Sequence, residues 1–178
     1  MKFISIDSSL AHTGIAIGTI GPTNVITVEE IALNSTEKSK NKQVRASSDT
    51  IERCQRTFQF VQACIFTHSP DVIFVETPSG SQSAAGMKSY GATCQLIATL
   101  VPDPIQVTPN EVKMASVGSK TASKVQMIEW AYAKYPKLEW YWHAKQLQAK
   151  NEHMADAVAI AHAGIKTADF IRIQHLIK

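Results

Sequence analysis

The sequence has few cysteines and no pattern that would use them as a metal site. Only three occur in 178 residues, at Cys54, Cys64 and Cys94. They are odd in number, widely spaced and form no C-x-x-C pair, which argues against a zinc ribbon, a thioredoxin-like redox motif and a disulfide-rich secreted scaffold. We therefore expect reduced cysteines in the core of an intracellular protein.

Long hydrophobic runs and export signals are also missing. No apolar stretch approaches the roughly 20 residues that a membrane-spanning helix needs, and the N-terminus lacks a charged and then apolar leader. No internal repeat or linker divides the sequence, so we expect a single domain over residues 1–178, without a membrane partner. The sequence predicts a cytoplasmic protein.

A strong charge of one sign is absent as well. Lys and Arg number 18 against 15 Asp and Glu, which gives a formal net charge of +3. The hydrophobic fraction of 44% and the charged fraction of 19% are those of a globular protein and argue against disorder. This mildly basic balance permits a nucleic acid as partner but does not demand one.

Hydrophobic periodicity predicts an α/β fold. Residues 3–7, 12–18 and 24–33 read as three strands of an antiparallel meander, and residues 71–76 and 104–107 as two further strands. Spacings of three and four predict helices from residue 48 to Ser69-Pro70, over 84–100, from the N-cap Thr108 to 114, and over 121–133. A helix over 151–165 closes the core. This order predicts a mixed sheet with helices on its faces.

Two stretches fit no periodic element. Residues 34–48 carry Lys38, Lys40, Lys42 and Arg45, and we expect a solvated loop, with contact to a phosphate backbone as the alternative. Residues 136–150 are expected to form an insertion that contains Trp140, Tyr141 and Trp142. A packed insertion is the favoured interpretation, and a base-stacking patch with basic neighbours is the alternative.

Three acids are candidate site residues, and two of them stand where open α/β sheets bind ligands. Asp7 and Glu76 each end a predicted strand, and Asp156 lies among small apolar residues of the closing helix. Positions three apart on a helix share a face, so His153 points the same way as Asp156. Carboxylates in a packed position are costly unless they are paired or bound to a metal. The composition therefore favours a two-metal site for phosphodiester hydrolysis.

The chain resembles RuvC-type Holliday junction resolvases, which are endonucleases of the ribonuclease H fold. The segments that carry the resemblance follow one another in the family's order: 4–10 with Thr13-Gly14, 70–76, Thr108-Pro109 with Val112-Lys113, Gly118, 122–124 and 153–161. The resemblance implies a ribonuclease H-like mixed five-stranded sheet, three strands antiparallel and then two parallel, flanked by helices.

The resemblance also implies roles for the acids. Asp7, Glu76 and Asp156 correspond to metal-binding catalytic carboxylates. His153 stands where many members carry a further Asp and is the expected fourth ligand, with Glu152 as the alternative. The implied cofactor is two Mg²⁺ ions in each active site, and an imidazole ligand accommodates Mn²⁺ as well.

Contacts with DNA are implied at two places. Lys113, Lys120 and Lys124 fall on or near basic positions that contact junction phosphates in the family. In the loop after Glu76 the family commonly has a stacking aromatic, whereas this sequence has Ser79 and, further on, Ser81. We expect this loop to contact DNA without stacking, as in a phage or mobile-element version that acts more broadly on branched DNA.

The implied function is a structure-selective endodeoxyribonuclease. It would resolve Holliday junctions, or other branched DNA such as three-way junctions and flaps, and leave 5′-phosphate and 3′-hydroxyl ends. We expect a homodimer with residues 84–100 as the dimer surface, in a bacterial or phage-infected cell. Two alternatives stay open: a non-catalytic protein that binds branched DNA, and an actin-like ATPase, which would need a second domain and a Gly-rich adenosine motif.

Overall fold

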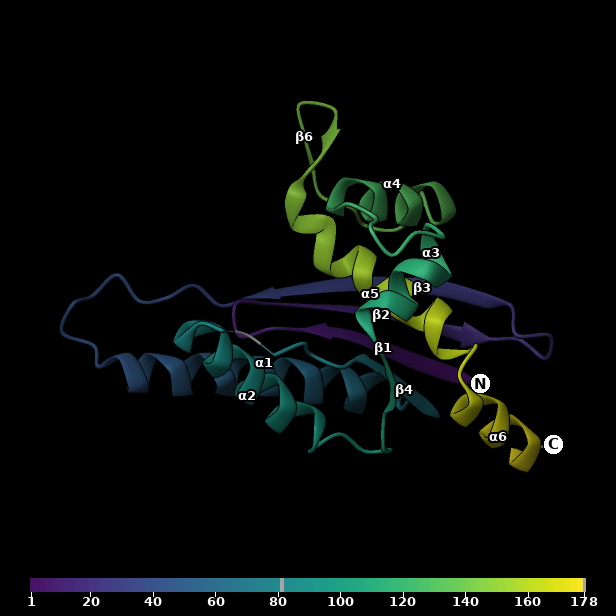
Figure 1. Cartoon of the computed structure of the whole chain (residues 1–178), viewed down its shortest axis with the longest axis horizontal. Helices are drawn as coiled ribbons and strands as arrows, with labels where there is room; N and C mark the ends of the chain where they lie inside the picture. The colour runs from purple at the N-terminus through teal and green to yellow at the C-terminus, as the bar shows by residue number, and fades with distance from the viewer. Residues whose placement is uncertain (81, 178) are drawn as a thin grey trace.

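The protein is built on one mixed sheet of five strands, as the computed structural model shows for residues 1–80 and 82–177 (Figure 1). The strands are β1 (Lys2–Ser8), β2 (His12–Ile20), β3 (Ile26–Ser35), β4 (Val72–Glu76) and β5 (Ile105–Val107). They lie in the order β3-β2-β1-β4-β5, with β1, β2 and β3 antiparallel and with β4 and β5 parallel to β1. The predicted ribonuclease H-like sheet is confirmed.

Helices cover both faces of this sheet (Figure 1). The described residues form α1 (Ala46–His68), α2 (Ala84–Ile97), α3 (Pro109–Ser116), α4 (Lys124–Lys134), α5 (Glu152–Gly164) and α6 (Ala168–Ile177). In Figure 1, α1 and α2 lie below the sheet, and α3, α4 and α5 lie above it. None of these helices has the length and the hydropathy needed to span a bilayer.

Each face of the sheet has its own hydrophobic core. Ile4 and Ile6 of β1 pack with Val61 of α1 and Leu96 of α2. Phe3, at an alternate position of the same strand, packs on the other face with the residues of α5. Side chains alternate along a strand, and a strand buried on both faces is apolar at nearly every position. This explains the short continuous apolar runs in the sequence.

The central helix α5 is held directly against the backbones of β1 and β2. The Ser5 hydroxyl, which is fully buried, donates a hydrogen bond to the carbonyl oxygen of Ala157 at 2.6 Å. A Cβ atom on Gly14 would lie 2.0 Å from the carbonyl oxygen of His153, so only glycine permits this approach. These contacts fix the first turn of α5 beside the end of β1.

The expectation that α5 closes the core is wrong. Helix α6 follows it, and Phe170 of this helix is fully buried with its ring centroid 5.6 Å from that of Phe74. The ring therefore completes the core on the α5 face. The expectation for the cysteines is half right, because all three thiols are free but lie at half-buried positions of α1 and α2.

Residues 136–150 form a small hairpin that stands away from the sheet (Figure 1). Its strands are β6 (Trp142–His143) and β7 (Gln146–Leu147), and a short 3₁₀ helix, η1 (Ala149–Asn151), leads into α5. The base of the hairpin is anchored, since the buried Trp140 indole donates to the Tyr135 carbonyl oxygen at 2.9 Å. The Asn151 amide bonds both the N–H and the carbonyl oxygen of Tyr141, at 2.9 and 2.8 Å.

Candidate active site

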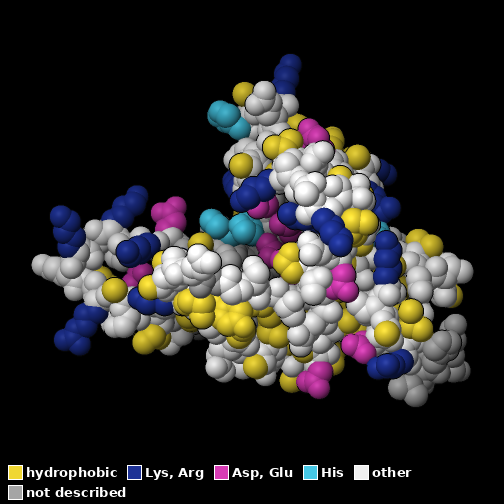
Figure 2. Space-filling model, in the orientation of Figure 1, with side chains coloured by type: hydrophobic (Ala, Val, Ile, Leu, Met, Phe, Trp, Pro, Cys, Tyr) yellow, Lys and Arg dark blue, Asp and Glu magenta, His cyan; other side chains and the backbone are white. Residues whose placement is uncertain are grey.

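Asp7 and Glu76 stand at the carboxyl ends of adjacent parallel strands. The register pairs Ile6 of β1 with Val75 of β4, so the next residue on each strand is an acid. Helix α5 reaches the same edge of the sheet and carries Asp156 in its second turn. Figure 2 shows acidic and histidine side chains gathered in the recess between the body of the sheet and the part that carries α4 and the hairpin. The structure therefore brings the predicted acids to one place.

His153 is in direct contact with one of these acids. Its Nδ1 atom donates a hydrogen bond to Oδ2 of Asp7 at 2.6 Å, and the two side chains are 22% and 17% exposed. Burial alone lowers the pKa of His153, but the hydrogen bond to Asp7 and the charge of that carboxylate outweigh burial and raise it. The pair is therefore an ion pair that offsets part of the negative charge in the recess.

The other two acids keep their protons to unusually high pH. Burial, followed by the charges of Asp7 and Asp156, raises the pKa of Glu76 to about 8. Burial, followed by the charges of Asp7 and Glu152, raises the pKa of Asp156 to about 7. Nearby cationic side chains lower both values but do not cancel the increase. The recess therefore has more acid groups than its own cations can neutralise.

The donor set of the recess suits a hard divalent cation. Three carboxylates and one imidazole are ligands that Mg²⁺ or Mn²⁺ accepts, and a bound cation would remove the electrostatic cost of ionising Glu76 and Asp156. In the described part of the chain, however, no three His, Cys, Asp or Glu side chains are already grouped to hold a metal ion. Asp7 is instead turned towards His153. The chemistry of the site fits a metal, and its coordination stays a prediction.

The predicted basic residues differ in their distance from the acids. Lys113 of α3 is half-buried, and it is near enough for its charge to lower the pKa of both Glu76 and Asp156. Lys124, at the start of α4, forms an ion pair with Glu152 at 2.8 Å. This pairing favours His153 over Glu152 as the fourth metal ligand beside the three acids. Lys120 is exposed in the turn between α3 and α4.

The loop after β4 presents small side chains to solvent. Ser79 is exposed, and so is the neighbouring Gly80, while Ser81 lies outside the described residues. The described part of this loop has no aromatic ring that could stack on a base. Its predicted contact with DNA stays a prediction.

His12 belongs to the site and was not singled out in the sequence. Its ring stacks on that of His153 with centroids 5.0 Å apart and an interplanar angle of 26°, and its Nδ1 atom lies 3.0 Å from the Ser35 hydroxyl. Burial and the charge of His153 lower the pKa of His12. The strand period could have identified it, because His12 is two residues before Gly14 and therefore shares the face that α5 covers.

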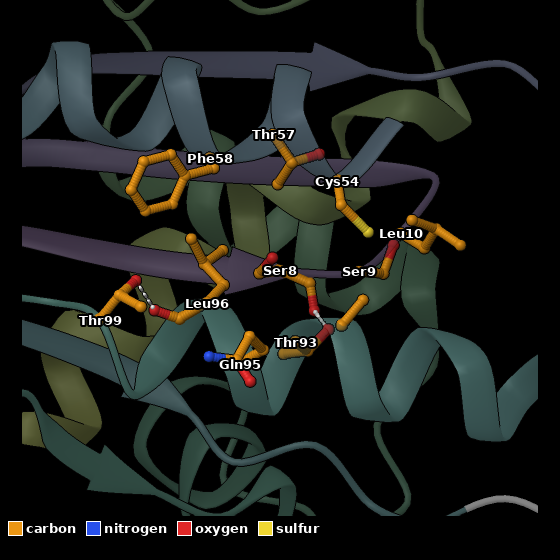
Figure 3. Close-up of a pocket in the computed structure, with 11 residues that line it drawn as sticks. Ser8, Ser9, Leu10, Cys54, Thr57, Phe58, Thr93, Gln95, Leu96 and Thr99 are labelled. Atoms are coloured by element: carbon orange, nitrogen blue, oxygen red, sulfur yellow. Dashed lines mark hydrogen bonds between the residues drawn. The ribbon is translucent and has the colours of Figure 1, made fainter. Parts of the chain in front are cut away.

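A separate apolar cavity lies behind the turn that follows Asp7. It has a volume of about 170 Å³ and is lined by α1, α2 and this turn, including Leu10, Phe58 and Leu96 (Figure 3). The Thr93 hydroxyl donates to the Ser8 carbonyl oxygen at 3.2 Å and ties α2 to the end of β1. No carboxylate, imidazole or cation lines the described wall of the cavity. Acid–base or metal chemistry therefore belongs to the recess of the acids, and not to this cavity.

Several solved structures that resemble this chain are Holliday junction resolvases. Thermus thermophilus RuvC in complex with a Holliday junction substrate is 18% identical over 97% of this chain and 96% of that one, with a TM-score of 0.66. The yeast mitochondrial Holliday junction resolvase Ydc2 is 14% identical over 98% of this chain and 82% of that one, with a TM-score of 0.60.

Fowlpox virus resolvase, solved as a complex with substrate Holliday junction DNA, is 17% identical over the full length of both chains, with a TM-score of 0.54. No protein-family model and no curated protein matches the sequence. The similarity therefore lies in the course of the backbone over nearly the whole chain. The chain has the ribonuclease H-like fold of RuvC-type Holliday junction resolvases.

Proposed function

We propose that the chain is a metal-dependent endodeoxyribonuclease that nicks Holliday junctions or other branched DNA in the cytoplasm of a bacterial or phage-infected cell. One observation carries the proposal: acids from β1, β4 and α5 meet in one recess whose negative charge the chain does not neutralise. The shared fold with resolvases solved on junction DNA supports the choice of substrate.

Four side chains would hold the two Mg²⁺ or Mn²⁺ ions, namely Asp7, Glu76, His153 and Asp156. Bound divalent ions would activate a water for attack on phosphorus and stabilise the departing 3′ oxygen, which leaves 5′-phosphate and 3′-hydroxyl ends. Lys113, near two of the acids, would hold the scissile phosphate by its point charge. His12 would keep the His153 ring in position by stacking on it.

Purified protein incubated with an end-labelled four-way junction and Mg²⁺ tests this function. We expect paired nicks near the branch point, with 5′ ends that DNA ligase can seal. EDTA should abolish them, and a linear duplex of the same sequence should stay intact. A gel shift without nicks, in Mg²⁺ and in Mn²⁺, would instead indicate a non-catalytic DNA-binding protein. ATP hydrolysis without nicks would indicate the actin-like alternative.

We also propose that two copies associate through the outer face of α2. Ala84, Ala85 and Gly91 are exposed there, and Met87 is 48% exposed. A Cβ atom on Gly91 would meet no atom of the chain within 4 Å. Packing within the chain therefore does not require glycine at this position, whereas close approach of a second copy would explain it. A dimer would present two active sites to the two strands of a junction.

Changing Gly91 to Arg should weaken this dimer. A long cation placed opposite its own copy adds a clash and like-charge repulsion, which should raise the dimer dissociation constant at least about tenfold. Sedimentation velocity over a range of concentrations measures the change. Ala133→Arg, on the exposed side of α4, controls for the added charge. A Gly91→Arg protein that dimerises like the wild type would place the dimer surface elsewhere.

A further inference from the structure

The β6–β7 hairpin carries an aromatic side chain that packing does not explain. Trp142 is 46% exposed although it is one of the largest apolar side chains of the protein. It makes an edge contact with Tyr132, whose ring centroid lies 5.3 Å away at an interplanar angle of 82°. Exposed aromatic surface on a projecting element is typical of a binding site.

The hairpin holds the backbone of Trp142 in a fixed position. The Gln148 side-chain amide donates to the Trp142 carbonyl oxygen at 2.7 Å, in addition to the anchoring of Trp140 and Tyr141 described above. At the tip, Ala144 and Lys145 have φ values of 45° and 65°, as a two-residue type I′ hairpin requires. Residues other than glycine at two such positions are unfavourable, so this tip lowers the stability of the hairpin. A fixed aromatic loses little entropy when it binds a ligand.

Cations accompany the exposed ring. Lys145 is exposed at the tip of the hairpin, and Lys150 lies with its Nζ atom 3.6 Å from the centre of the Tyr141 ring. Lys and His side chains are visible at the far end of the hairpin in Figure 2. Aromatic rings interleaved with lysines suit a ligand that has both flat apolar faces and negative charges.

A groove extends from the hairpin to Glu152, the first residue of α5. It has a volume of about 590 Å³ and lies between the hairpin and α4, with Trp142 and Lys145 at one part of its wall and Lys124 and Glu152 at another. Val125, Ile128 and Leu147 give it an apolar lining. Glu152 is paired with Lys124 and directly precedes His153. The groove therefore ends next to the turn of α5 that carries His153.

We propose that the groove takes an unpaired nucleotide of the branched DNA, with Trp142 stacked on its base and Lys145 on a neighbouring phosphate. This inference rests on the proposed nuclease function. The apolar lining and the exposed indole suit the face of a base, and a fully paired duplex offers no free base face. The described part of the loop after β4 supplies no ring for this task. The hairpin would therefore select branched over linear DNA.

Fluorescence anisotropy on a four-way junction and on a matched linear duplex tests the inference. The measurements use the Asp7→Asn background in Mg²⁺, so that no strand is cut. Adding Trp142→Ala should weaken junction binding about fivefold or more, because stacking on one base contributes at least about 1 kcal/mol. Affinity for the linear duplex should change little. Trp142→Phe should retain most of the preference, and Phe66→Ala, which removes an 87% exposed ring on α1, should retain all of it.

A 2-aminopurine placed at the branch point reports the stacking directly. Its fluorescence should be quenched on binding of the parent protein and should stay bright with Trp142→Ala, whose thermal unfolding should match the parent. Equal junction affinity and equal quenching in both would overturn the inference while wild-type cleavage stays intact. A changed sedimentation coefficient with unchanged DNA binding would also overturn it, in favour of a protein contact. If the Asp7→Asn protein showed no preference for branched DNA and the wild type did not cleave it, the proposed nuclease function itself would be rejected.

Discussion

Asp7→Asn is expected to abolish junction cleavage while leaving affinity for the intact junction close to that of the wild type. Asp7 is the acid whose charge acts on both of the others, since it raises the pKa of Glu76 and of Asp156. An amide in its place is a weak ligand for a divalent cation. The loss of several kcal/mol of transition-state stabilisation corresponds to a rate at least about a thousandfold lower.

The same substitution should change the free energy of unfolding only slightly. It removes the charged partner of His153, whose Nδ1 lies 2.6 Å from the Asp7 carboxylate, and this change is unfavourable. It also removes a negative charge that opposes ionisation of Glu76 and Asp156, and this change is favourable. The two effects have opposite signs, so loss of activity and loss of folding can be separated.

Single-turnover cleavage and thermal unfolding, measured on the same preparations, check both parts of this prediction. Asp169→Asn is the matched control, because Asp169 is an exposed acid on α6 whose contact is a surface ion pair with Arg172 at 3.3 Å. This variant should cut junctions like the wild type. An Asp7→Asn protein that cuts at the wild-type rate would show that Asp7 takes no part in cleavage. If Asp7→Asn does not fold, Glu76→Gln in the same assay would test whether the acids of the recess are needed for cleavage.

The strand-ending acids could be predicted because the signal for them is local. The apolar run before Asp7 and the one before Glu76 each stop at a carboxylate followed by turn residues, and this pattern locates both ends without any knowledge of pairing. The parallel pairing of β1 with β4 is not local, and the resemblance to known resolvases supplied it. The five strands and their relative directions were therefore predicted, whereas their order across the sheet comes from the structure.

The parts of the molecule that were missed depend on contacts between distant segments. The strand period places His12 on the same face as Gly14, but His12 reaches the site because Gly14 lets α5 approach β2, which is a contact between distant segments. The hairpin has strands of only two residues and turns on Ala144 and Lys145, where Asn-Gly or Asp-Gly would have given a signal. Helix α6 joins the core through Phe170, whose ring packs on Phe74 of β4, and this contact between distant segments cannot be read from the local sequence.

Stability without metal should fall as the pH rises from about 6.5 to about 8. The pKa values of Asp156 and Glu76 in the folded chain are about 7 and about 8, above their ordinary values of 3.8 and 4.5. The folded state therefore retains protons that the unfolded chain releases, so ionisation opposes folding in this window by about 1 kcal/mol per pH unit for each group that titrates. The raised pKa of His153 acts in the same direction. The lowered pKa values of His12 and His162 act in the opposite direction, but only below about pH 6.5.

Mg²⁺ should cancel this loss, because it binds the ionised carboxylates and must displace their protons. Its affinity should therefore rise about tenfold per pH unit for each proton released, most steeply below about pH 7, and should level off above about pH 8. Calorimetric titration in two buffers of different ionisation enthalpy counts the protons. Thermal unfolding in EDTA and in Mg²⁺ measures the stability.

Substitutions of single acids test whether Glu76 and Asp156 cause this pH dependence. Glu76→Gln and Asp156→Asn each remove a titrating acid, so each should flatten the decline of stability with pH in EDTA and should reduce the number of protons that Mg²⁺ displaces. Glu37→Gln, at an exposed position of the loop before α1, should leave both unchanged. If Mg²⁺ bound with equal affinity at about pH 6 and about pH 8, it would not be bound to Glu76 and Asp156, since a cation that reaches these carboxylates at about pH 6 must displace their protons.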